Sequence, residues 1–444
     1  MSPDEDLRSQ AEAHRRAAEA AEQATEWQDA VREYEQALSL VAQAGDAAGQ
    51  DEAALLTGLG RCYWNLSEAR PAWRTLRRAM TLYDERDDAI GLARATVEIR
   101  RIWGPPERHR EFVEHALERL GDVEPHLQAL LLAYQRWDDE TAFDRAMALA
   151  EEHGFEDVLA IRKDEHAWKA MREGRVDEAV RLTTESHNTF ARLGRHDAAA
   201  ATLRGAAFGL IEMGRLDEGY AVAERSFEYA TKVHLNFQSQ LALMDMAGVA
   251  FARGDFAQCE EIVAMAPTDS DFRGDLYRMW IAEAQGDIDR ALQLMVSPER
   301  GGNTPTAMGQ IHAAAAGLLY RAGKREAAAQ ALRAWADVQR GDDDEAYWME
   351  APALVECFLD LGDEGLVRAV YDRLRARDER SVAPVRFATL QGRSLFPLRG
   401  GICARLGLIE EARQHYREGI AWCEAEGCAA DAGACRRGLA ALEG

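Results

Sequence analysis

"EGRVDEAVRL", residues 173–182, and "MGRLDEGYAV", residues 213–222, repeat nearly the same ten residues at a distance of forty. The shared pattern is Gly, a polar residue, an apolar residue, two polar residues and a small residue. It begins at a series of glycines: Gly174, Gly214, Gly254, Gly286, Gly323 and Gly407, with a weaker copy at Gly362. Consecutive copies are 40, 40, 32, 37, 39 and 45 residues apart, a spacing typical of solenoid proteins.

Each copy predicts the joint between two helices. Glycine can end a helix because it adopts the left-handed conformation without a steric penalty. The acidic residues that follow suit the first turn of the next helix, where the helix dipole favours negative charge. One helical hairpin cannot bury its apolar faces alone, so the hairpins are expected to stack and share a core.

Length and composition agree with a stack of helices. At 444 residues the chain exceeds the size at which one compact core keeps growing. It is rich in alanine and has only 11 prolines, and β-branched runs of strand length are scarce. We therefore expect almost no sheet.

The charge of the chain restricts its partners. Asp and Glu number 77 against 53 Lys and Arg, which gives a formal net charge of -24. This field repels phosphate backbones, and no Lys/Arg block is present, so we expect no nucleic-acid partner. A well-solvated acidic surface also keeps a long alanine-rich molecule soluble.

The sequence predicts a cytoplasmic protein. The N-terminus runs into an amphipathic helix without an apolar stretch of signal-peptide type, and no window is apolar enough to span a membrane. The seven cysteines are odd in number, and Cys62, Cys259 and Cys357 each stand alone in a helical pattern. They suit reduced thiols better than a disulfide framework.

Residues 55–80, "LLTGLGRCYWNLSEARPAWRTLRRAM", carry a family resemblance. The matching residues on the first helical face are Leu56, Leu59, Gly60 and Tyr63. After a turn at Ser67, those on the second helix are Ala72, Leu76 and Ala79. They resemble the tetratricopeptide repeat (TPR), whose helices read W-x2-LG-x2-Y and A-x3-F-x2-A. Leu56 replaces the Trp, and Asp84 stands near the place of the usual Pro. A second copy, residues 25–38, matches through Trp27, Ala30 and Tyr34.

A further resemblance concerns residues 102–133, where a Gly-Pro turn precedes a helix that ends in Leu-Gly-Asp. This stretch is similar to the TPR-like arm of large MalT/LuxR-type bacterial regulators. Those proteins add an ATPase module and a DNA-binding helix-turn-helix, and this sequence shows neither. The resemblance therefore implies an interaction role.

Together these patterns predict an all-α protein, a right-handed superhelical α-solenoid of about eleven TPR-like hairpins. We expect a single domain over residues 1–444, with divergent repeats at 5–153, more regular repeats at 156–425 and a capping helix at 428–442. The repeat period is nearer 40 than the 34 residues of the TPR, which implies longer helices. Short interruptions are expected at residues 104–107, 267–272 and 297–309.

No catalytic or metal-binding pattern stands out. Residues 300–310 lack the GxxxxGK[ST] phosphate loop, and His109 and His115 are spaced wrongly for one zinc ion. Cys428 and Cys435 lack a C-x2-C partner pattern, so they are expected to be buried as small apolar residues. The acidic run at residues 342–345 is read as the start of a helix. We expect no enzyme activity, no cofactor and no metal.

The first helix of each hairpin is expected to line a concave groove. Small and apolar residues 8, 7 and 4 positions before the turn glycine should be buried, such as Ala206, Ala207 and Leu210, or Met246, Ala247 and Ala250. The other face should look into the groove and bind a partner: Arg61, Trp64, Asn65, Trp168, Arg172, Arg204, Phe208, Met244, Phe251, Arg273, Trp280, Tyr320 and Arg321. Aromatic and Arg side chains dominate binding hot spots, although an aromatic ring in this position can equally fill a gap between helices.

Two functions fit this reading. The first is a non-catalytic scaffold or adaptor that holds a segment of another protein or a peptide in the groove. The second is a regulatory receptor whose superhelix closes around a short peptide or small molecule. A scaffold needs several separated anchors, whereas a receptor needs one convergent pocket. The sequence gives no sign of self-association.

Overall fold

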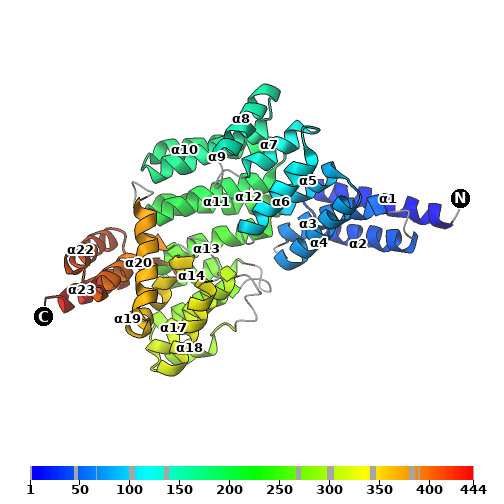
Figure 1. The fold of residues 1–444 in the computed structure, drawn as a ribbon. Helices are drawn as coiled ribbons and strands as arrows, with labels where there is room; N and C mark the ends of the chain where they lie inside the picture. The colour runs from blue at the N-terminus through cyan, green and yellow to red at the C-terminus, as the bar shows by residue number, and fades with distance from the viewer. Residues whose placement is uncertain are drawn as a thin grey trace. The chain divides into compact units, whose positions relative to one another are not determined.

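The computed structural model of the chain describes residues 3–44, 49–66, 68–99, 106–134, 140–266, 272–297, 305–340, 347–379, 386–388 and 391–443. The predicted turn at Ser67, the acidic run at 342–345 and most of the three predicted interruptions lie outside these residues. The described part of the chain forms 23 α-helices, α1 to α23, with one 3-10 helix and one two-stranded ribbon (Figure 1). This confirms the all-α solenoid.

The helices follow one another as eleven successive pairs, after which one more helix ends the chain. The first four pairs are α1 (Pro3–Gln23), α2 (Trp27–Ala44), α3 (Gly49–Asn65), α4 (Ala69–Glu85), α5 (Ala89–Ile99), α6 (Pro106–Leu120), α7 (Pro125–Ala133) and α8 (Glu140–His153). The next four are α9 (Glu156–Arg172), α10 (Val176–Arg192), α11 (His196–Glu212), α12 (Leu216–Lys232), α13 (Asn236–Ala252), α14 (Phe256–Ala264), α15 (Phe272–Ala284) and α16 (Ile288–Gln293). The remainder are α17 (Pro305–Arg321), α18 (Arg325–Arg340), the 3-10 helix η3 (Tyr347–Leu354), α19 (Val355–Leu361), α20 (Glu364–Glu379), α21 (Phe396–Arg405), α22 (Ile409–Ala425) and α23 (Ala429–Ala441).

Left-handed residues set the length of the central helices. Gly154, Gly174, Gly194, Gly214 and Gly254 have φ of 74°, 74°, 70°, 81° and 74°, and His234 occupies the equivalent place with φ 55°. These residues recur every twenty positions. Each helix from α9 to α13 therefore has 17 residues and is followed by a three-residue turn. Two such helices give the forty-residue period, and the expected lengthening of the TPR helices is confirmed.

The other predicted turn glycines behave as expected, with one exception. Gly286, Gly323 and Gly407 are left-handed, with φ of 85°, 73° and 76°. Gly362, the weak copy, is instead extended, with φ -66° and ψ 139°. In the N-terminal repeats, Thr25 and Asp87 take the left-handed position that glycine holds elsewhere.

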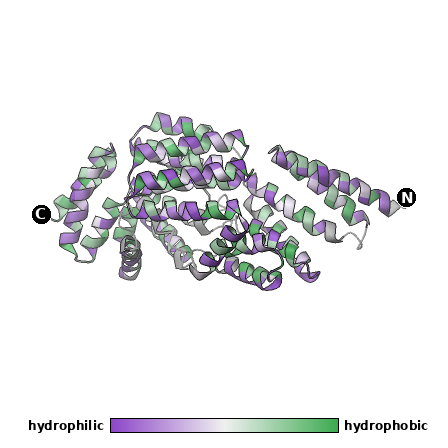
Figure 2. Cartoon of the chain, turned by 90° about the horizontal axis from the view of Figure 1, so that it is seen from above, coloured by the Kyte–Doolittle hydropathy of each residue, from purple (hydrophilic) through white to green (hydrophobic). Residues whose placement is uncertain are grey.

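The described residues group into two compact units. Unit 1 contains residues 1–166, 182–202 and 228–239, and unit 2 contains 167–181, 203–227 and 240–444, so α9 to α13 each contribute one end to each unit. Apolar and polar residues alternate around the helices (Figure 2). The positions predicted for the core are buried, including Ala207, Leu210, Ala247 and Ala250.

All seven cysteines are buried and free, which confirms the reading of Cys428 and Cys435 as small apolar residues. Burial raises the pKa of both thiols to about 12. Among the described helices, none is long and apolar enough to cross a membrane.

Unit 2 contains a contact that the repeat pattern does not predict. The strands β1 (Phe387–Ala388) and β2 (Arg393–Ser394) form an antiparallel ribbon. The backbone N–H of Arg386 donates to the carbonyl of Glu212 at the end of α11, at 2.7 Å. Trp422 on α22 lies against the turn at Gly214, where an added Cβ would fall 2.6 Å from the indole Nε1. The C-terminal helices of unit 2 therefore pack on the α11–α12 turn.

This packing gives a matched pair of glycine substitutions. Gly214→Ala and Gly174→Ala both place a side chain at left-handed φ, which costs about 1–2 kcal/mol. Gly174 has open space around it, whereas Gly214 faces Trp422. We expect Gly214→Ala to lower the melting temperature clearly more than Gly174→Ala in thermal unfolding. Equal losses would contradict the contact between Trp422 and the α11–α12 turn.

Candidate partner-binding surface on the first helices

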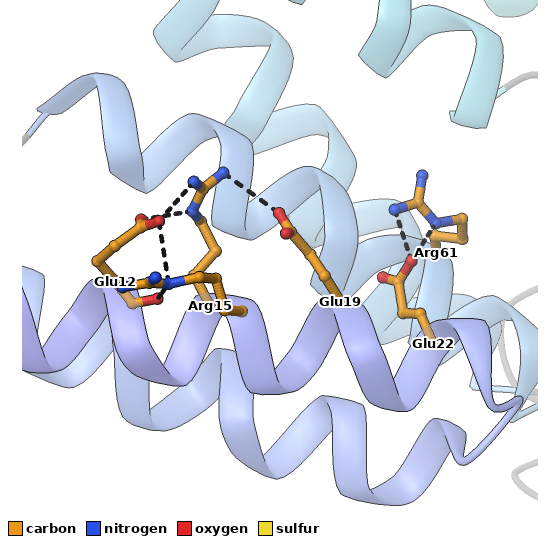
Figure 3. A network of polar contacts seen from close by, with 6 residues as sticks. Glu12, Arg15, Glu19, Glu22 and Arg61 are labelled. Carbon is orange, nitrogen blue, oxygen red and sulfur yellow. Dashed lines mark hydrogen bonds and ion pairs between the residues drawn. The ribbon is translucent and has the colours of Figure 1, made fainter.

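Arginines on the first helices of the hairpins bind carboxylates on neighbouring first helices. In unit 1, Arg61 on α3 contacts Glu22 on α1 at 2.8 Å and Glu98 on α5 at 3.2 Å (Figure 3 shows the contact with Glu22). Burial opposes the charge of Arg61, but the two carboxylates raise its pKa overall. The pairs bridge residues 39 and 37 positions apart, about one repeat.

Arg321 in unit 2 repeats this arrangement. From α17 it donates to Glu283 on α15 at 3.0 Å and to Glu356 on α19 at 3.2 Å. The neighbouring Tyr320 hydroxyl donates to Asp360, also on α19, at 2.6 Å. Arg321 is therefore a bridge between successive hairpins, and two carboxylates already compensate its charge.

Arg204 differs from these two arginines in its charge environment. Its Nε donates to Asp245 on α13 at 3.2 Å, and its guanidinium carbon lies 5.1 Å from the ring centroid of Phe208. Asp245 is fully buried, while the Arg204 side chain keeps 13% of its exposure. Burial raises the pKa of Asp245 to about 6, although Arg204 and Arg273 lower it. Here two arginines act on one carboxylate.

Trp168 on α9 extends this surface. Its indole lies over two glycines of α11, since a Cβ on Gly205 would come within 3.1 Å of the ring and a Cβ on Gly209 within 3.4 Å. The glycines thus allow the large ring to approach the α11 backbone. We call Trp168, Arg204 and Phe208 the α9–α11 platform; all three side chains are partly exposed.

The structure places eight of the predicted groove residues at partly exposed positions: Arg61, Trp168, Arg172, Arg204, Phe208, Arg273, Tyr320 and Arg321. The prediction of exposure is wrong for Trp64, Asn65 and Trp280, which are 7%, 6% and 4% exposed. Trp64 packs on Phe237 with ring centroids 4.5 Å apart, and Trp280 on α15 packs on Phe251 of α13 with ring centroids 6.2 Å apart. These tryptophans fill gaps between helices.

Met244 and Phe251 are also buried, which contradicts their assignment to the groove. Residues 239–251 of α13 are buried without interruption. Part of the cover is the ribbon of unit 2, because Gly392 approaches the Gly248 carbonyl and Phe251, and the Arg393 guanidinium carbon lies 5.6 Å from the Phe251 ring centroid. The chain itself therefore occupies this part of the expected groove.

Sequence reasoning missed the acidic partners of the arginines. Asp245 is the sole charged residue in α13, between apolar neighbours in "LALMDMAG". A lone acid in an apolar helix, 41 residues from an arginine on the preceding first helix, was the available signal. Within the described residues, no group of three His, Cys, Asp or Glu side chains could hold a metal ion.

The sequence and the structure were compared with known proteins. No family model and no curated protein matches the sequence. Among solved structures, the chain is similar to yeast Tom70 (12% identity over 96% of this chain and 95% of that chain, TM-score 0.33). It is also similar to a Rap protein complexed with competence and sporulation factor (13% identity over 85% of this chain and 99% of that chain, TM-score 0.42). A third similar structure is the human IFIT1 dimer with m7Gppp-AAAA (14% identity over 94% of this chain and 94% of that chain, TM-score 0.40).

Identities and scores this low carry no argument. The chain's own geometry, with successive paired helices joined at left-handed residues, is that of an all-α helical-repeat solenoid.

The raised pKa of Asp245 predicts a pH-dependent stability. An unfolded Asp titrates near pH 4, so between about pH 4 and 6 the folded state binds more protons than the unfolded state. Asp245 therefore adds about 3 kcal/mol to the free energy of unfolding below this pH range. This stabilisation is lost as the pH rises through the range. Asp245→Asn should remove this trend.

The measurement is the free energy of unfolding in urea across this pH range. The difference between wild type and Asp245→Asn should fall as the pH rises, while the exposed control Asp289→Asn should follow wild type. Parallel curves for wild type and Asp245→Asn would mean that Asp245 titrates normally in the folded protein.

Proposed function

We propose that this chain is a non-catalytic interaction scaffold that holds a segment of another protein or a peptide on the α9–α11 platform. The supporting observation is the state of Arg204. Asp245 fixes its Nε from behind, and among the described residues Arg204 has no other hydrogen-bond partner. Its terminal N–H groups are not among the buried, unsatisfied atoms, so they remain available to a ligand.

The platform matches the physical requirements of a binding anchor. The orientation of Arg204 is fixed before binding, by Asp245 and by Phe208, which reduces the entropy lost on association. Trp168 offers apolar area with few rotatable bonds. The partner segment is therefore expected to carry a carboxylate for Arg204 beside an apolar or aromatic group for Trp168.

Charge supports a protein partner over nucleic acid. The clusters at Arg61 and Arg321 each contain two carboxylates for one arginine, whereas Arg204 is paired with one carboxylate, Asp245. An acidic side chain of a partner would give Arg204 a second carboxylate. The whole chain at -24 still disfavours a long polyanion.

The receptor alternative requires side chains that converge on one pocket. The platform side chains come instead from two first helices, α9 and α11, and are partly exposed, which favours a scaffold. The resemblance of residues 102–133 to the arm of MalT/LuxR-type regulators also supports an interaction role. In the structure this stretch contains α6 and α7, joined near the left-handed Gly121.

The test compares captured proteins across matched variants. Arg204→Met would leave Asp245 buried without its partner, so the double variant Arg204→Met, Asp245→Asn removes both charges and is closer to neutral for folding. Arg225→Met, at an exposed position of α12, is the control. We expect a partner captured from the native host by wild type and the control to be lost from the double variant.

Titration of the captured partner then gives the magnitude. Truncating a true anchor costs about 2 kcal/mol or more of binding free energy, which is roughly 30-fold in Kd. Trp168→Ala should weaken binding to a similar degree. A partner that binds the double variant and Trp168→Ala as tightly as wild type would refute the platform as the binding surface.

A further inference from the structure

The ribbon of unit 2, with its described residues 386–388 and 391–395, lies on the part of α13 where the sequence predicts a groove. It stands between α20 and α21, whereas the helices from α9 to α13 are joined by turns of three residues. Its strands pair Phe387 with Ser394 and Ala388 with Arg393. The helical repeat therefore does not account for this segment, and its contacts show what holds it.

The backbone of the ribbon meets the backbones of α11 and α13. N–H groups of the turn after α11 satisfy the carbonyls of residues 209–211, and the N–H of Arg386 satisfies the remaining carbonyl of the helix end, that of Glu212. Gly392 has a φ of 55°, and an added Cβ would fall 2.8 Å from the carbonyl oxygen of Gly248 on α13. Glycines on both sides thus allow the close approach.

Phe387 is the apolar anchor of the ribbon. Its side chain is fully buried, and its ring centroid lies 6.2 Å from that of Trp422 on α22. The other apolar residues of this cluster come mainly from α11, α12 and α13: Ile211, Leu216 and Val249. An aromatic side chain buried in a closed apolar pocket is typical of the residues that dominate protein–protein binding.

Arg393 and Asp431 form the polar anchor. The guanidinium carbon of Arg393 lies 5.6 Å from the ring centroid of Phe251, and its Nη1 lies 3.7 Å from Asp431 Oδ1. Asp431 on α23 is buried and accepts the backbone N–H of Ser394 at 2.6 Å. A carboxylate that binds one backbone N–H and one side chain of a short segment combines the two elements of peptide recognition, which are main-chain hydrogen bonds and side-chain sites.

The ribbon also carries a group that opposes its own binding. Gln391 is 3% exposed, and its Oε1 has no hydrogen-bond partner among the described residues. A buried acceptor without a donor costs free energy. A segment with the same two anchors and an apolar residue in place of Gln391 would avoid this cost.

We propose that the ribbon is an internal ligand: it occupies a site for a short β-hairpin of another protein, and a hairpin that carries an aromatic residue and, six positions later, an arginine preceded by glycine can displace it. The aromatic ring takes the place of Phe387, the glycine passes Gly248, and the arginine binds Asp431. No residue of this site belongs to the α9–α11 platform, so the proposal does not rest on the function proposed for the platform.

The probe is a fluorescent peptide with the sequence of residues 386–395, RFATLQGRSL. A cysteine added at each end, outside the pair formed by Arg386 and Leu395, closes it with a disulfide, because a free two-stranded hairpin is marginally stable. In the wild-type chain the tethered ribbon competes at an effective concentration on the order of millimolar. We therefore expect wild type to bind the peptide weakly.

Fluorescence anisotropy compares wild type with the double variant Phe387→Ala, Gly392→Ala. The first change removes the apolar anchor of the ribbon, and the second places a Cβ against the Gly248 carbonyl. The double variant should bind the peptide at least about tenfold more tightly than wild type. Gly407→Ala is the control, because Gly407 is also left-handed but has open space around it, and it should bind like wild type.

Peptide variants assign the binding to the two anchors. Peptides that carry Phe387→Ala or Arg393→Met should bind the double variant at least about tenfold more weakly than the parent peptide. Failure of the folded double variant to bind the parent peptide, or equal binding of all three peptides, would overturn the proposal. Equal binding to wild type and the double variant would also overturn it, since the peptide would then not compete with the ribbon.

Hydrogen exchange of the wild-type chain decides the question if the double variant does not fold. A displaceable ribbon opens without global unfolding, so amides of residues 386–395 should exchange at least about tenfold faster than those of α11 and α13. Circular dichroism shows whether the variants fold. Exchange of the ribbon amides only together with those of α11 and α13 would make the ribbon a fixed part of the core and would refute the internal ligand.

Discussion

The left-handed residue that recurs every twenty positions is the constraint on which the central repeats depend. It fixes five helices at 17 residues each, and because their lengths are equal, equivalent faces return to the same place in every hairpin. Small residues such as Ala207 and Ala247 then fall forty positions apart on successive first helices, and both are buried in the core of unit 2. The same regularity places a side chain on one first helix opposite its counterpart about forty residues away.

Ion pairs join charged side chains that lie about one repeat apart on neighbouring first helices. Arg61, Arg204 and Arg321 each contact a carboxylate on a neighbouring first helix, and the acids lie 35 to 41 residues from the arginines. These pairs are not exposed surface ion pairs, because the carboxylates are all largely buried: Glu22, Glu98, Glu283 and Asp245. A buried carboxylate without its arginine would be costly, so each pair specifies how one hairpin sits on the next. Two of the three arginines that the sequence assigned to the binding groove, Arg61 and Arg321, thus each bind two carboxylates and join successive hairpins.

The closed packing within unit 2 limits where a ligand can bind. The ribbon and α22 reach the α11–α12 turn, and the ribbon covers α13, so the first-helix surface is not continuous. The α9–α11 platform remains partly exposed on the first helices, and there Asp245 fixes an Arg204 side chain that keeps 13% of its exposure.

The sequence by itself determined the repeat, its period, the turn glycines and the buried small residues, because these depend on local backbone preference and on periodicity along one helix. The sequence also assigned Trp168, Arg204 and Phe208 to the groove-facing side of the first helices. It could not distinguish them from Trp64 and Trp280, since a ring on the same helical face is exposed or buried according to what the neighbouring hairpin presents. Only the tertiary structure showed that Phe237 packs on Trp64, that Asp245 fixes Arg204, and that Arg386 and Gly392 lie against α11 and α13. These contacts join residues from about 40 to more than 170 positions apart, and no local pattern encodes such pairings.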